Sequence, residues 1–254
     1  MTVQLAYAEH GVPEGVPVLF ASSIGSSRIM WSRQVDPVSA RRWMIAFDHR
    51  GHGASPVPEG PYEIADLAAD VVALMDARGI VVADFVGLSL GAMVGMHLAA
   101  HHPDRIRRLV LACTTPYMPP PDLWIERAAK VRAHGMSSIV DHVLGRWFTP
   151  DFSAHHPDRV APLREQFLAT APVGYAECGL AISRMDLRGS VSSIVAPTLV
   201  IAGDADPATT PATCRALADS IDGAAYAEVA ASHIAAVEAP DAFTDLILTH
   251  LTEG

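Results

Sequence analysis

Four short and almost continuous apolar runs stand in the first 113 residues. They read "VPVLFAS", "WMIAFD", "VADFVGLS" and "RRLVLAC", and each is bounded by Gly, Pro or polar residues. Strands buried on both faces have this continuous apolar character, which is typical of parallel sheets. Between the second and third runs, apolar residues recur at the spacing of one helical face, at Ile64, Leu67, Val71 and Leu74. This alternation predicts an α/β fold with a mostly parallel central sheet flanked by helices.

The pattern changes between residues 114 and 189. "TTPYMPPPDLW" opens this segment with a proline cluster, and helical patterns without a convincing strand follow. Strands return with "APTLVIAGD" and "AAYAEVA", and helices are expected from near Pro211 and Pro240. We therefore expect a core of residues 1–113 and 190–254, with residues 114–189 inserted before the last strands as a helical cap, or lid, over the ligand-binding strand ends. The alternative is that residues 114–189 form an ordinary helical layer.

Composition argues against several classes of function. Half of the 254 residues are hydrophobic and the formal net charge is -10, so we expect a buried core and no binding of nucleic acid or anionic membranes. No secretory leader is evident, and no run approaches the roughly 18 apolar residues of a membrane span. Cys113, Cys178 and Cys214 are odd in number and widely spaced, which indicates neither a disulfide framework nor a zinc site. These features predict a cytoplasmic protein whose partner is a small molecule.

A serine stands between two glycines at the end of the third apolar run. "GLSLG", residues 87–91, fits the Gly-x-Ser-x-Gly pattern in its required place between a strand and a helix. The tight turn favours glycine on both sides and pushes Ser89 out on a strained backbone, where the helix N-terminus favours negative charge. Ser89 is either a turn former or a nucleophile, and its context favours the nucleophile.

A serine nucleophile needs a base and a group that orients the base. In a strand-turn-helix arrangement of this kind, the expected chain order is Ser, then Asp or Glu, then His. Asp204 and Asp206 in "LVIAGDADPATTP" both follow a strand, and we prefer Asp206 because the Gly-x-x-Asp-Pro spacing turns its carboxylate inward. Of the twelve histidines, His233 in "ASHIAAVEAP" alone combines the right order with a place between the last strand and the last helix. Ser89, Asp206 and His233 are thus the predicted catalytic triad.

The tetrahedral intermediate of acyl transfer also needs hydrogen-bond donors for its oxyanion. The backbone N–H of Leu90, directly after Ser89, is one expected donor, and the N–H of Ile24 in the loop "SSIGSS" is the other. Ser22 and Ser23 precede Ile24, and we place Ser23 among the residues that contact substrate. The alternative is that these serines only satisfy the backbone of a turn.

Together these motifs resemble the α/β-hydrolase superfamily along nearly the whole chain. "FDHRGHGAS" resembles the loop that follows the strand before the nucleophile in that superfamily. Within it, the chain is most similar to the 3-oxoadipate enol-lactonases, on the strength of "SSIGSSRIMW", "GLSLGAMVG", "RAHGM", "RWFTPDF" and "YAECGLAISRMDLRG". Because "VQLAYAEHG" resembles the second strand of the usual fold, the first edge strand is missing and about seven strands are expected.

The resemblance implies a substrate and a reaction. The substrate would be a five-membered enol lactone with a carboxymethyl arm, opened to 3-oxoadipate in aromatic catabolism without metal or organic cofactor. Its carboxylate would need a local cation, and the candidates in residues 114–189 are Arg127, Arg132, Arg146, Arg184 and Arg188. Of these we favour Arg127 and Arg146, with Trp124 and Trp147 as apolar walls. The alternatives are an esterase or cofactor-free perhydrolase for other small esters, and a ligand-binding receptor that retains a triad.

Overall fold

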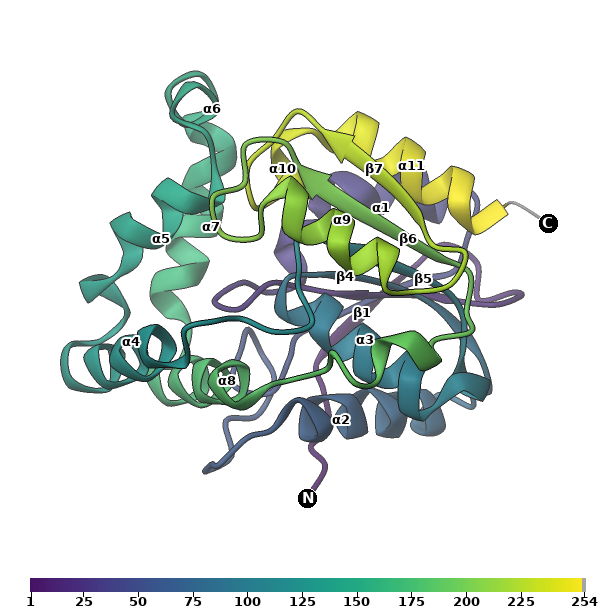
Figure 1. Cartoon of the computed structure of the whole chain (residues 1–254), viewed down its shortest axis with the longest axis horizontal. Helices are drawn as coiled ribbons and strands as arrows, with labels where there is room; N and C mark the ends of the chain where they lie inside the picture. Colours follow the sequence, from purple (N-terminus) through teal and green to yellow (C-terminus); the bar gives the residue numbers. More distant parts are fainter. Residues whose placement is uncertain (253–254) are drawn as a thin grey trace.

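A seven-stranded sheet forms the centre of the computed structural model, which describes residues 1–252 (Figure 1). Its strand order is β1-β3-β2-β4-β5-β6-β7, with β1 antiparallel to β3 and all other neighbours parallel. The strands are β1 (Tyr7–His10), β2 (Val18–Ala21), β3 (Met44–Phe47), β4 (Ala83–Leu88), β5 (Ile106–Ala112), β6 (Thr198–Gly203) and β7 (Ala225–Val229). The predicted α/β-hydrolase fold with a mostly parallel sheet of about seven strands is confirmed.

Helices connect the strands and cover the sheet. They are α1 (Ser32–Ser39), α2 (Ile64–Ala77), α3 (Leu90–His101), α4 (Pro121–His134), α5 (Val140–Trp147), α6 (Pro150–His155), α7 (Pro157–Ala169), α8 (Pro172–Arg184), α9 (Pro211–Asp219), α10 (Ala235–Glu238) and α11 (Pro240–Thr252). Short 3-10 segments are η1 (Arg28–Trp31), η2 (Pro103–Arg105), η3 (Met136–Ser138) and η4 (Val191–Ser193). We did not predict α1 from the sequence, because it is short, largely polar and contains Pro37.

The sheet lies between two helical layers. Helices α1 and α11 pack on each other over one face, and α2 and α3 pack on each other over the opposite face (Figure 1). Coverage on both sides explains why β2, β3, β4 and β6 consist entirely of buried residues. The continuous apolar runs of the sequence therefore correspond to the central strands of this sheet.

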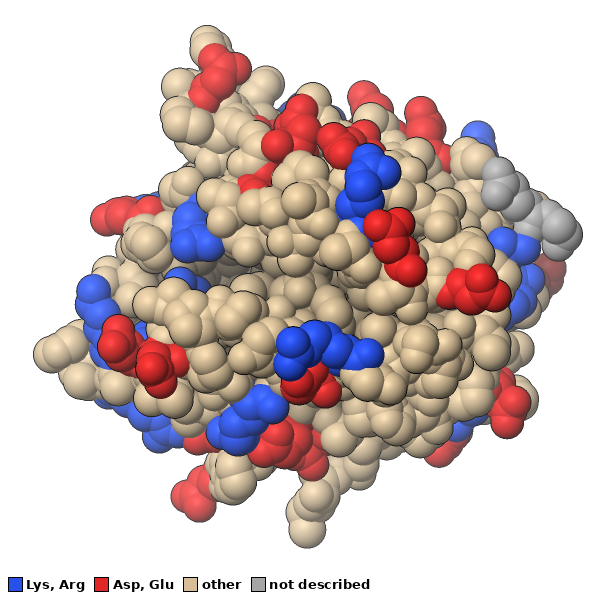
Figure 2. All heavy atoms as spheres, in the orientation of Figure 1, with Lys and Arg blue, Asp and Glu red and all other residues tan. Residues whose placement is uncertain are grey.

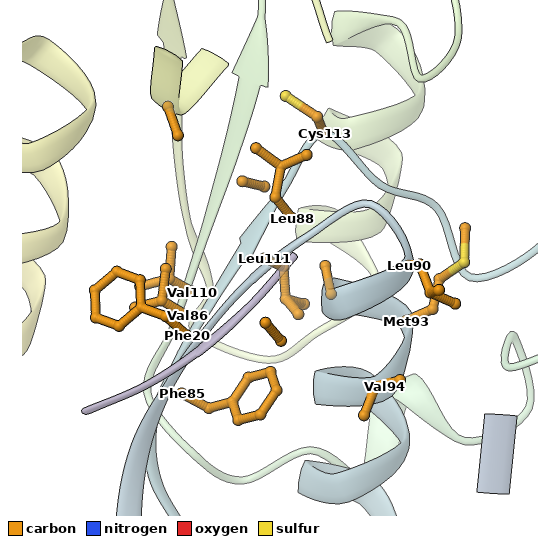
Figure 3. Packing of buried hydrophobic residues seen from close by; sticks show 14 of the residues in the cluster. Phe20, Phe85, Val86, Leu88, Leu90, Met93, Val94, Val110, Leu111 and Cys113 are labelled. Carbon is orange, nitrogen blue, oxygen red and sulfur yellow. The ribbon is translucent and has the colours of Figure 1, made fainter. Parts of the chain in front are cut away.

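Helix α3 is packed directly against β4, and this packing positions the start of the helix. A methyl group added at Gly95 would lie 2.9 Å from the ring of Phe85, so the helix can approach the strand only because Gly95 has no side chain. Figure 3 shows Phe85 between β4 and α3, whereas Met93 and Val94 point to the other side of the helix and are also buried. A helix that is apolar on all sides belongs in a protein interior. The N-terminus of α3 is thereby fixed at the carboxyl end of β4.

Helices α4 to α8 stand together at one end of the sheet (Figure 1). In this part of the described chain, residues 114–189, the β-structure consists of a single antiparallel bridge between Tyr117 and Asp186. Trp147 packs edge-on against Phe167, and Phe167 packs in the same way against Tyr175, which gives the helices an aromatic core of their own. The helical character of this segment agrees with the sequence pattern, and its role as a cap stays a prediction.

Surface charge, helix length and the state of the cysteines concern possible contacts with nucleic acid, membranes and metal ions. Over the face of the described chain drawn in Figure 2, acidic and basic side chains are interspersed and neither sign forms a continuous patch. Within residues 1–252, no helix combines the length and the apolar character that crossing a bilayer requires. Cys113, Cys178 and Cys214 are buried free thiols.

Candidate active site

Ser89 occupies a strained turn between β4 and α3. Its φ is 57° and its ψ is -115°, a region that residues with a side chain rarely adopt. On either side, a Cβ at Gly87 would lie 2.5 Å from the nitrogen of Ala92, and a Cβ at Gly91 would lie 2.1 Å from the oxygen of Ala21. Both approaches exclude any side chain, which accounts for the two glycines of the motif.

His233 and Asp206 meet on neighbouring loops at the carboxyl end of the sheet. His233 lies between β7 and α10, and its Nδ1 is 2.8 Å from Oδ2 of Asp206, which lies on the loop after β6. Asp204 is exposed instead, and its Oδ1 accepts a hydrogen bond of 3.1 Å from the N–H of Ala231. The structure therefore brings Asp206, and not Asp204, to the imidazole.

The carboxylate of Asp206 is held in its ionised form. Its oxygens accept hydrogen bonds from the Thr209 hydroxyl at 2.6 Å and from the Ala208 N–H at 2.7 Å. Burial by itself would raise the pKa of Asp206, but the charge of His233 and the hydrogen bonds from His233, Thr209 and Ala208 lower this pKa below its ordinary value. An ionised Asp206 can orient the His233 ring and stabilise it when it becomes an imidazolium.

Two backbone N–H groups beside Ser89 are free to bind an anion. Within residues 1–252, neither Ile24 nor Leu90 donates its N–H to a protein acceptor. Leu90 is the first residue of α3, where helical N–H groups have no partner inside the helix. Ile24 lies in a turn closed by the Ser26 N–H, which donates to the Ser23 carbonyl at 3.1 Å. This pair of free donors fits the expected oxyanion hole, and that role stays a prediction.

Two buried histidines hold the loop that carries Ile24. His52 accepts the N–H of Gly25 on Nε2 at 2.9 Å, so its Nδ1 carries the proton and donates to the Arg50 carbonyl at 3.1 Å. His49 donates from Nε2 to the carbonyl of Ser22 at 3.2 Å. Burial and the neighbouring His52 lower the pKa of His49 to about 3, although the hydrogen bond to Ser22 opposes the shift. Both rings are therefore neutral supports of the loop at ordinary pH.

The neutral His49 predicts acid-sensitive stability. Because its pKa in the folded state, about 3, lies below the ordinary value of 6.5, the unfolded chain binds the extra proton between these pH values. The free energy of unfolding should fall with decreasing pH across this window, at about 1.4 kcal/mol per pH unit for this one group. A His49→Gln variant keeps a donor for Ser22 but cannot titrate, so its stability should depend less steeply on pH. Urea unfolding at pH 5, 6 and 7 measures both slopes, and parallel curves would contradict the assignment.

A cavity of about 260 Å³ lies between the strand ends and the α4–α8 segment. The sheet side contributes Ser23, Ile24, Ser89, Pro207, Ala208 and His233. The helical side contributes Met118, Pro119, Pro120, Leu123, Trp124, Arg127, Val143, Arg146, Trp147 and Tyr175. Of the predicted site residues, Asp206 and Leu90 lie outside this lining. Asp206 reaches the site through His233, and Leu90 is expected to act through its backbone alone.

The five candidate arginines separate into two groups. Arg127 and Arg146 line the cavity, in agreement with the preference for them. The other three form ion pairs elsewhere: Arg132 with Glu177, Arg184 with Glu63, and Arg188 with Asp186. The Arg146 side chain donates to the Pro207 carbonyl at 3.3 Å, whereas the Arg127 guanidinium lies 4.7 Å above the ring of Trp124.

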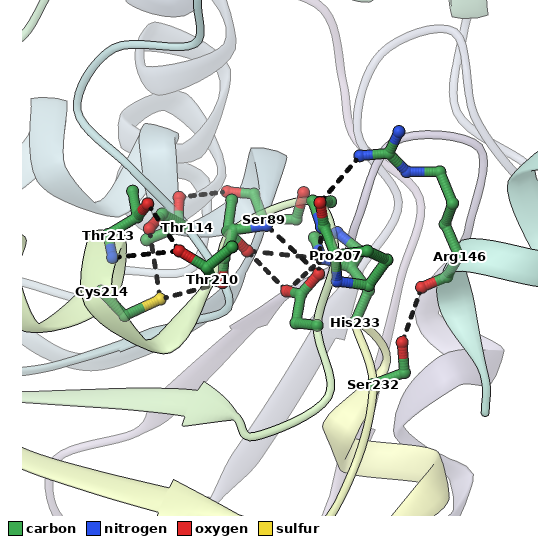
Figure 4. A network of polar contacts seen from close by, with 12 residues as sticks. Ser89, Thr114, Arg146, Pro207, Thr210, Thr213, Cys214, Ser232 and His233 are labelled. Atoms are coloured by element: carbon green, nitrogen blue, oxygen red, sulfur yellow. Dashed lines mark hydrogen bonds and ion pairs between the residues drawn. The ribbon is translucent and has the colours of Figure 1, made fainter.

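The end of α5 is hydrogen-bonded to both sides of His233. The Ser232 hydroxyl donates to the Arg146 carbonyl at 2.8 Å (Figure 4). The Ile234 N–H donates to the Trp147 carbonyl at 3.0 Å. Glu238 adds a third link, because its carboxylate accepts the Ser232 N–H at 2.9 Å and also the hydroxyl of Thr149. The segment that forms one wall of the cavity thus also fixes the loop of His233.

Several site residues were missed from the sequence. Ala208 and Thr209 come two and three positions after the predicted acid and lie within the stretch quoted for it, but no pattern indicated that they would bind its carboxylate. The prolines of "YMPPP" were interpreted only as the start of the helical segment, and two of them line the cavity. Tyr175 carried no signal, because its position depends on the packing of α8 in three dimensions.

The fold and this arrangement of residues define a class of protein. The chain belongs to the α/β-hydrolase fold family, whose model matches residues 16–240. It is therefore an enzyme of the ester-hydrolysing kind, in agreement with the resemblance deduced from the motifs.

Three individual proteins of this family are similar to the chain over nearly its whole length. The chain is 37% identical over 245 residues to 3-oxoadipate enol-lactonase 2 of Acinetobacter baylyi, covering 96% of this chain and 92% of that protein. The crystal structure of the enol-lactonase from Burkholderia xenovorans LB400 is 42% identical and superposes with a TM-score of 0.97, covering 99% of this chain and 97% of that one. A thermophilic esterase from Thermogutta terrifontis with malate bound is 26% identical, with a TM-score of 0.93 over 98% of this chain and 93% of that one.

Proposed function

We propose that this chain hydrolyses the lactone ring of 3-oxoadipate enol-lactone to give 3-oxoadipate, through an acyl-enzyme on Ser89. One observation carries the proposal: Ser89 and His233, whose imidazole is bound by Asp206, face a small cavity whose far side holds an arginine free to bind a carboxylate. The similarity to enol-lactonases from two organisms supports this substrate. We further propose that residues 114–189 act as a cap, because they supply the far side of the cavity.

The proposed reaction needs only groups of this chain and water. Ser89 Oγ attacks the lactone carbonyl while His233 Nε2 takes its proton, and the N–H groups of Ile24 and Leu90 receive the oxyanion. Collapse of the intermediate breaks the bond to the ring oxygen, and His233 returns the proton to that oxygen. The leaving enol stays tethered to the acyl group, and its ketonisation removes the nucleophile that would close the ring again. Water activated by His233 then releases 3-oxoadipate from Ser89.

Arg127 is the better candidate for the substrate carboxylate. Within the described chain its guanidinium forms no ion pair, and stacking on Trp124 holds it at the cavity. The hydroxyl of Tyr175, which also lines the cavity, is buried beside the Arg127 guanidinium and makes no hydrogen bond of normal geometry within residues 1–252. Burial raises the pKa of Tyr175 although the charge of Arg127 opposes the shift, so the phenol stays protonated and can donate. A guanidinium and a phenol together match a carboxylate at the end of a short arm.

Replacing Arg127 should separate charged from neutral substrates. An Arg127→Gln variant should lose about 10- to 100-fold in kcat/KM for the enol lactone, the value of one or two charge-assisted hydrogen bonds. Its kcat/KM for p-nitrophenyl acetate, which has no carboxylate, should stay within about 2-fold of wild type. Steady-state kinetics with both substrates measures this difference.

Two further variants serve as controls for Arg127→Gln. Arg188→Gln removes the same charge from outside the cavity and should leave both substrates unaffected. Arg146→Gln tests the second cavity arginine, which already donates to Pro207. A larger loss for Arg146→Gln than for Arg127→Gln would transfer the role to Arg146.

The substrate itself is tested by the loss of absorbance of freshly generated enol lactone. The proposal expects a kcat/KM for this lactone well above that for p-nitrophenyl acetate. A preference for the neutral ester by orders of magnitude would support the esterase alternative, which the similarity to the Thermogutta esterase favours. Acylation of Ser89 without turnover would instead support a ligand-binding receptor.

A further inference from the structure

Ser23 places a buried hydroxyl in the cavity without a protein partner. Its side chain is fully buried, and its Oγ has no hydrogen-bond partner among residues 1–252. The preceding hydroxyl differs, because Ser22 Oγ donates to the Ser27 carbonyl at 2.9 Å inside the loop. Of these two neighbouring hydroxyls, that of Ser22 therefore holds the loop together and that of Ser23 does not.

An unpaired buried hydroxyl is a net cost to the folded state. Leaving such a group without a partner costs about 1–3 kcal/mol relative to pairing it, whereas an alanine at the same place would leave no polar group unsatisfied. Turn formation does not explain Ser23, because the hydroxyl takes part in no turn hydrogen bond of the described chain. Since Ser23 lines the same cavity as Ser89 and His233, a ligand in that cavity is the available partner.

The position of Ser23 indicates which ligand atom it reaches. Its Oγ is separated from the N–H of Ile24 only by Cβ, Cα and the carbonyl carbon, and both residues line the same cavity, so one ligand atom can be reached by both groups. The loop is fixed against the nucleophile turn, because the Gly91 N–H donates to the Ser22 carbonyl at 3.1 Å. His52 fixes its other side through Gly25. The backbone that carries the hydroxyl is thus fixed beside the turn of Ser89 and its free N–H donors.

We propose that the Ser23 hydroxyl is a third donor to the oxyanion of the tetrahedral intermediate on Ser89, alongside the N–H groups of Ile24 and Leu90. The inference rests on the proposed Ser89 mechanism, but not on the identity of the lactone. Ser23 keeps its proton throughout and only donates a hydrogen bond, so it adds no proton transfer to the reaction. The hydroxyl, which has no partner within the described chain, can donate to the negative charge that develops on the substrate, which favours the transition state over the ground state.

Ser23→Ala should lose activity without losing stability. We expect kcat for p-nitrophenyl acetate to fall on the order of 10²-fold, as for other oxyanion-hole donors, with KM changed by less than about 3-fold. The midpoint of thermal unfolding should stay equal to wild type or rise, because the variant no longer buries an unpaired hydroxyl. Ser22→Ala is the matched control: it removes the hydrogen bond to Ser27 and should lower the unfolding midpoint. If Ser23→Ala keeps wild-type kcat, or loses stability as Ser22→Ala does, the proposal is wrong.

Leaving groups distinguish the oxyanion from the departing oxygen. A donor to the oxyanion should slow p-nitrophenyl acetate and ethyl acetate by similar factors, because both form the same oxyanion. A donor to the leaving oxygen should slow ethyl acetate much more, since ethoxide is the poorer leaving group. An effect confined to ethyl acetate would therefore overturn the proposal.

Binding of phenylboronic acid tests Ser23 independently of turnover. Ser89 Oγ adds to the trigonal boron, His233 takes the serine proton, and a boron-bound oxygen of the tetrahedral adduct enters the oxyanion hole. Calorimetry should give a Kd at least about 10-fold higher for Ser23→Ala than for wild type, and an unchanged Kd would contradict the proposal. A chain that binds the boronate and does not open the enol lactone would overturn the proposed substrate, and the Ser23 comparison would still be decided.

Discussion

A Ser89→Ala variant should fold like the wild type and lose hydrolytic activity by a factor of at least about 10⁴. The proposed route passes through a covalent bond to Ser89 Oγ, and an alanine leaves no atom that can form it. The fold should be retained because alanine keeps the Cβ of serine. The turn between β4 and α3 depends on the close contacts of Gly87 and Gly91 and not on the serine hydroxyl. Steady-state kinetics with the enol lactone and circular dichroism of the same preparation measure the two results.

The control for Ser89→Ala is a serine outside the cavity. Ser193 is exposed, and its hydroxyl donates only to the nearby Ser190 carbonyl at 2.7 Å, so Ser193→Ala should keep wild-type kinetics. Labelling with a fluorophosphonate should modify wild type and Ser193→Ala and leave Ser89→Ala unmodified. A folded Ser89→Ala variant with activity near that of wild type would refute the nucleophile assignment.

Asp206→Asn should cost about 10³- to 10⁴-fold in kcat. Asparagine has the shape of aspartate but carries no charge, so it cannot stabilise His233 as an imidazolium. Its amide can also turn an N–H toward Nδ1, which would place the imidazole proton on the nitrogen that must accept the proton of Ser89. The measurement is kcat for both the lactone and p-nitrophenyl acetate, which should fall together because the defect lies in the base and not in substrate binding.

Asp204→Asn is a closely matched control for Asp206→Asn. It makes the same chemical change two residues earlier on the same loop, at an exposed side chain that only accepts the Ala231 N–H. We expect kcat to stay within about 3-fold of wild type. If Asp204→Asn showed the larger loss of activity, Asp204 would be the triad acid in solution and the observed loop arrangement would not be the active one.

The sheet was predictable because burial on both faces leaves a clear signal. The runs that contain β2 to β5 are apolar almost without interruption, and their short length with Gly, Pro or polar residues at both ends favours buried strands over buried helices. Helix α1 was not predictable, because the elements that it packs against include α10 and α11 near the other end of the chain. Such packing replaces the local signals of a helix and leaves no regular pattern in its own sequence.

The site was predictable where backbone geometry restricts residue type. Backbone contacts at Gly87 and Gly91 are too close to admit a side chain, so only glycine fits at either position. The motif around Ser89 can therefore be recognised from the sequence alone. The choice between Asp204 and Asp206 rested on turn spacing alone, whereas in the structure hydrogen bonds from Ala208 and Thr209 hold the Asp206 carboxylate toward His233.

The sequence does not reveal which of the five arginines are engaged in ion pairs. Arg132 and Arg184 are paired with carboxylates 45 and 121 positions away, and such partners cannot be read from local sequence. Arg127 and Arg146 were preferred from the sequence, and only the ion pairs of the folded chain separated them from the other three. Tyr175 and the unpaired hydroxyl of Ser23 depend in the same way on what the fold places around them.

The hydrogen bonds from the end of α5 to Ser232 and Ile234 restrict how this enzyme can be redesigned. Arg146 and Trp147 line the cavity, and together with Thr149 they hold the loop of His233 in place. A chimaera that receives helices α4 to α8 from a relative would replace the residues at the end of α5 and keep the native loop around His233 to which they are hydrogen-bonded. Residues 146–149 and 232–238 should therefore be transferred together, as one inherited unit, whenever a new substrate range is grafted onto this scaffold.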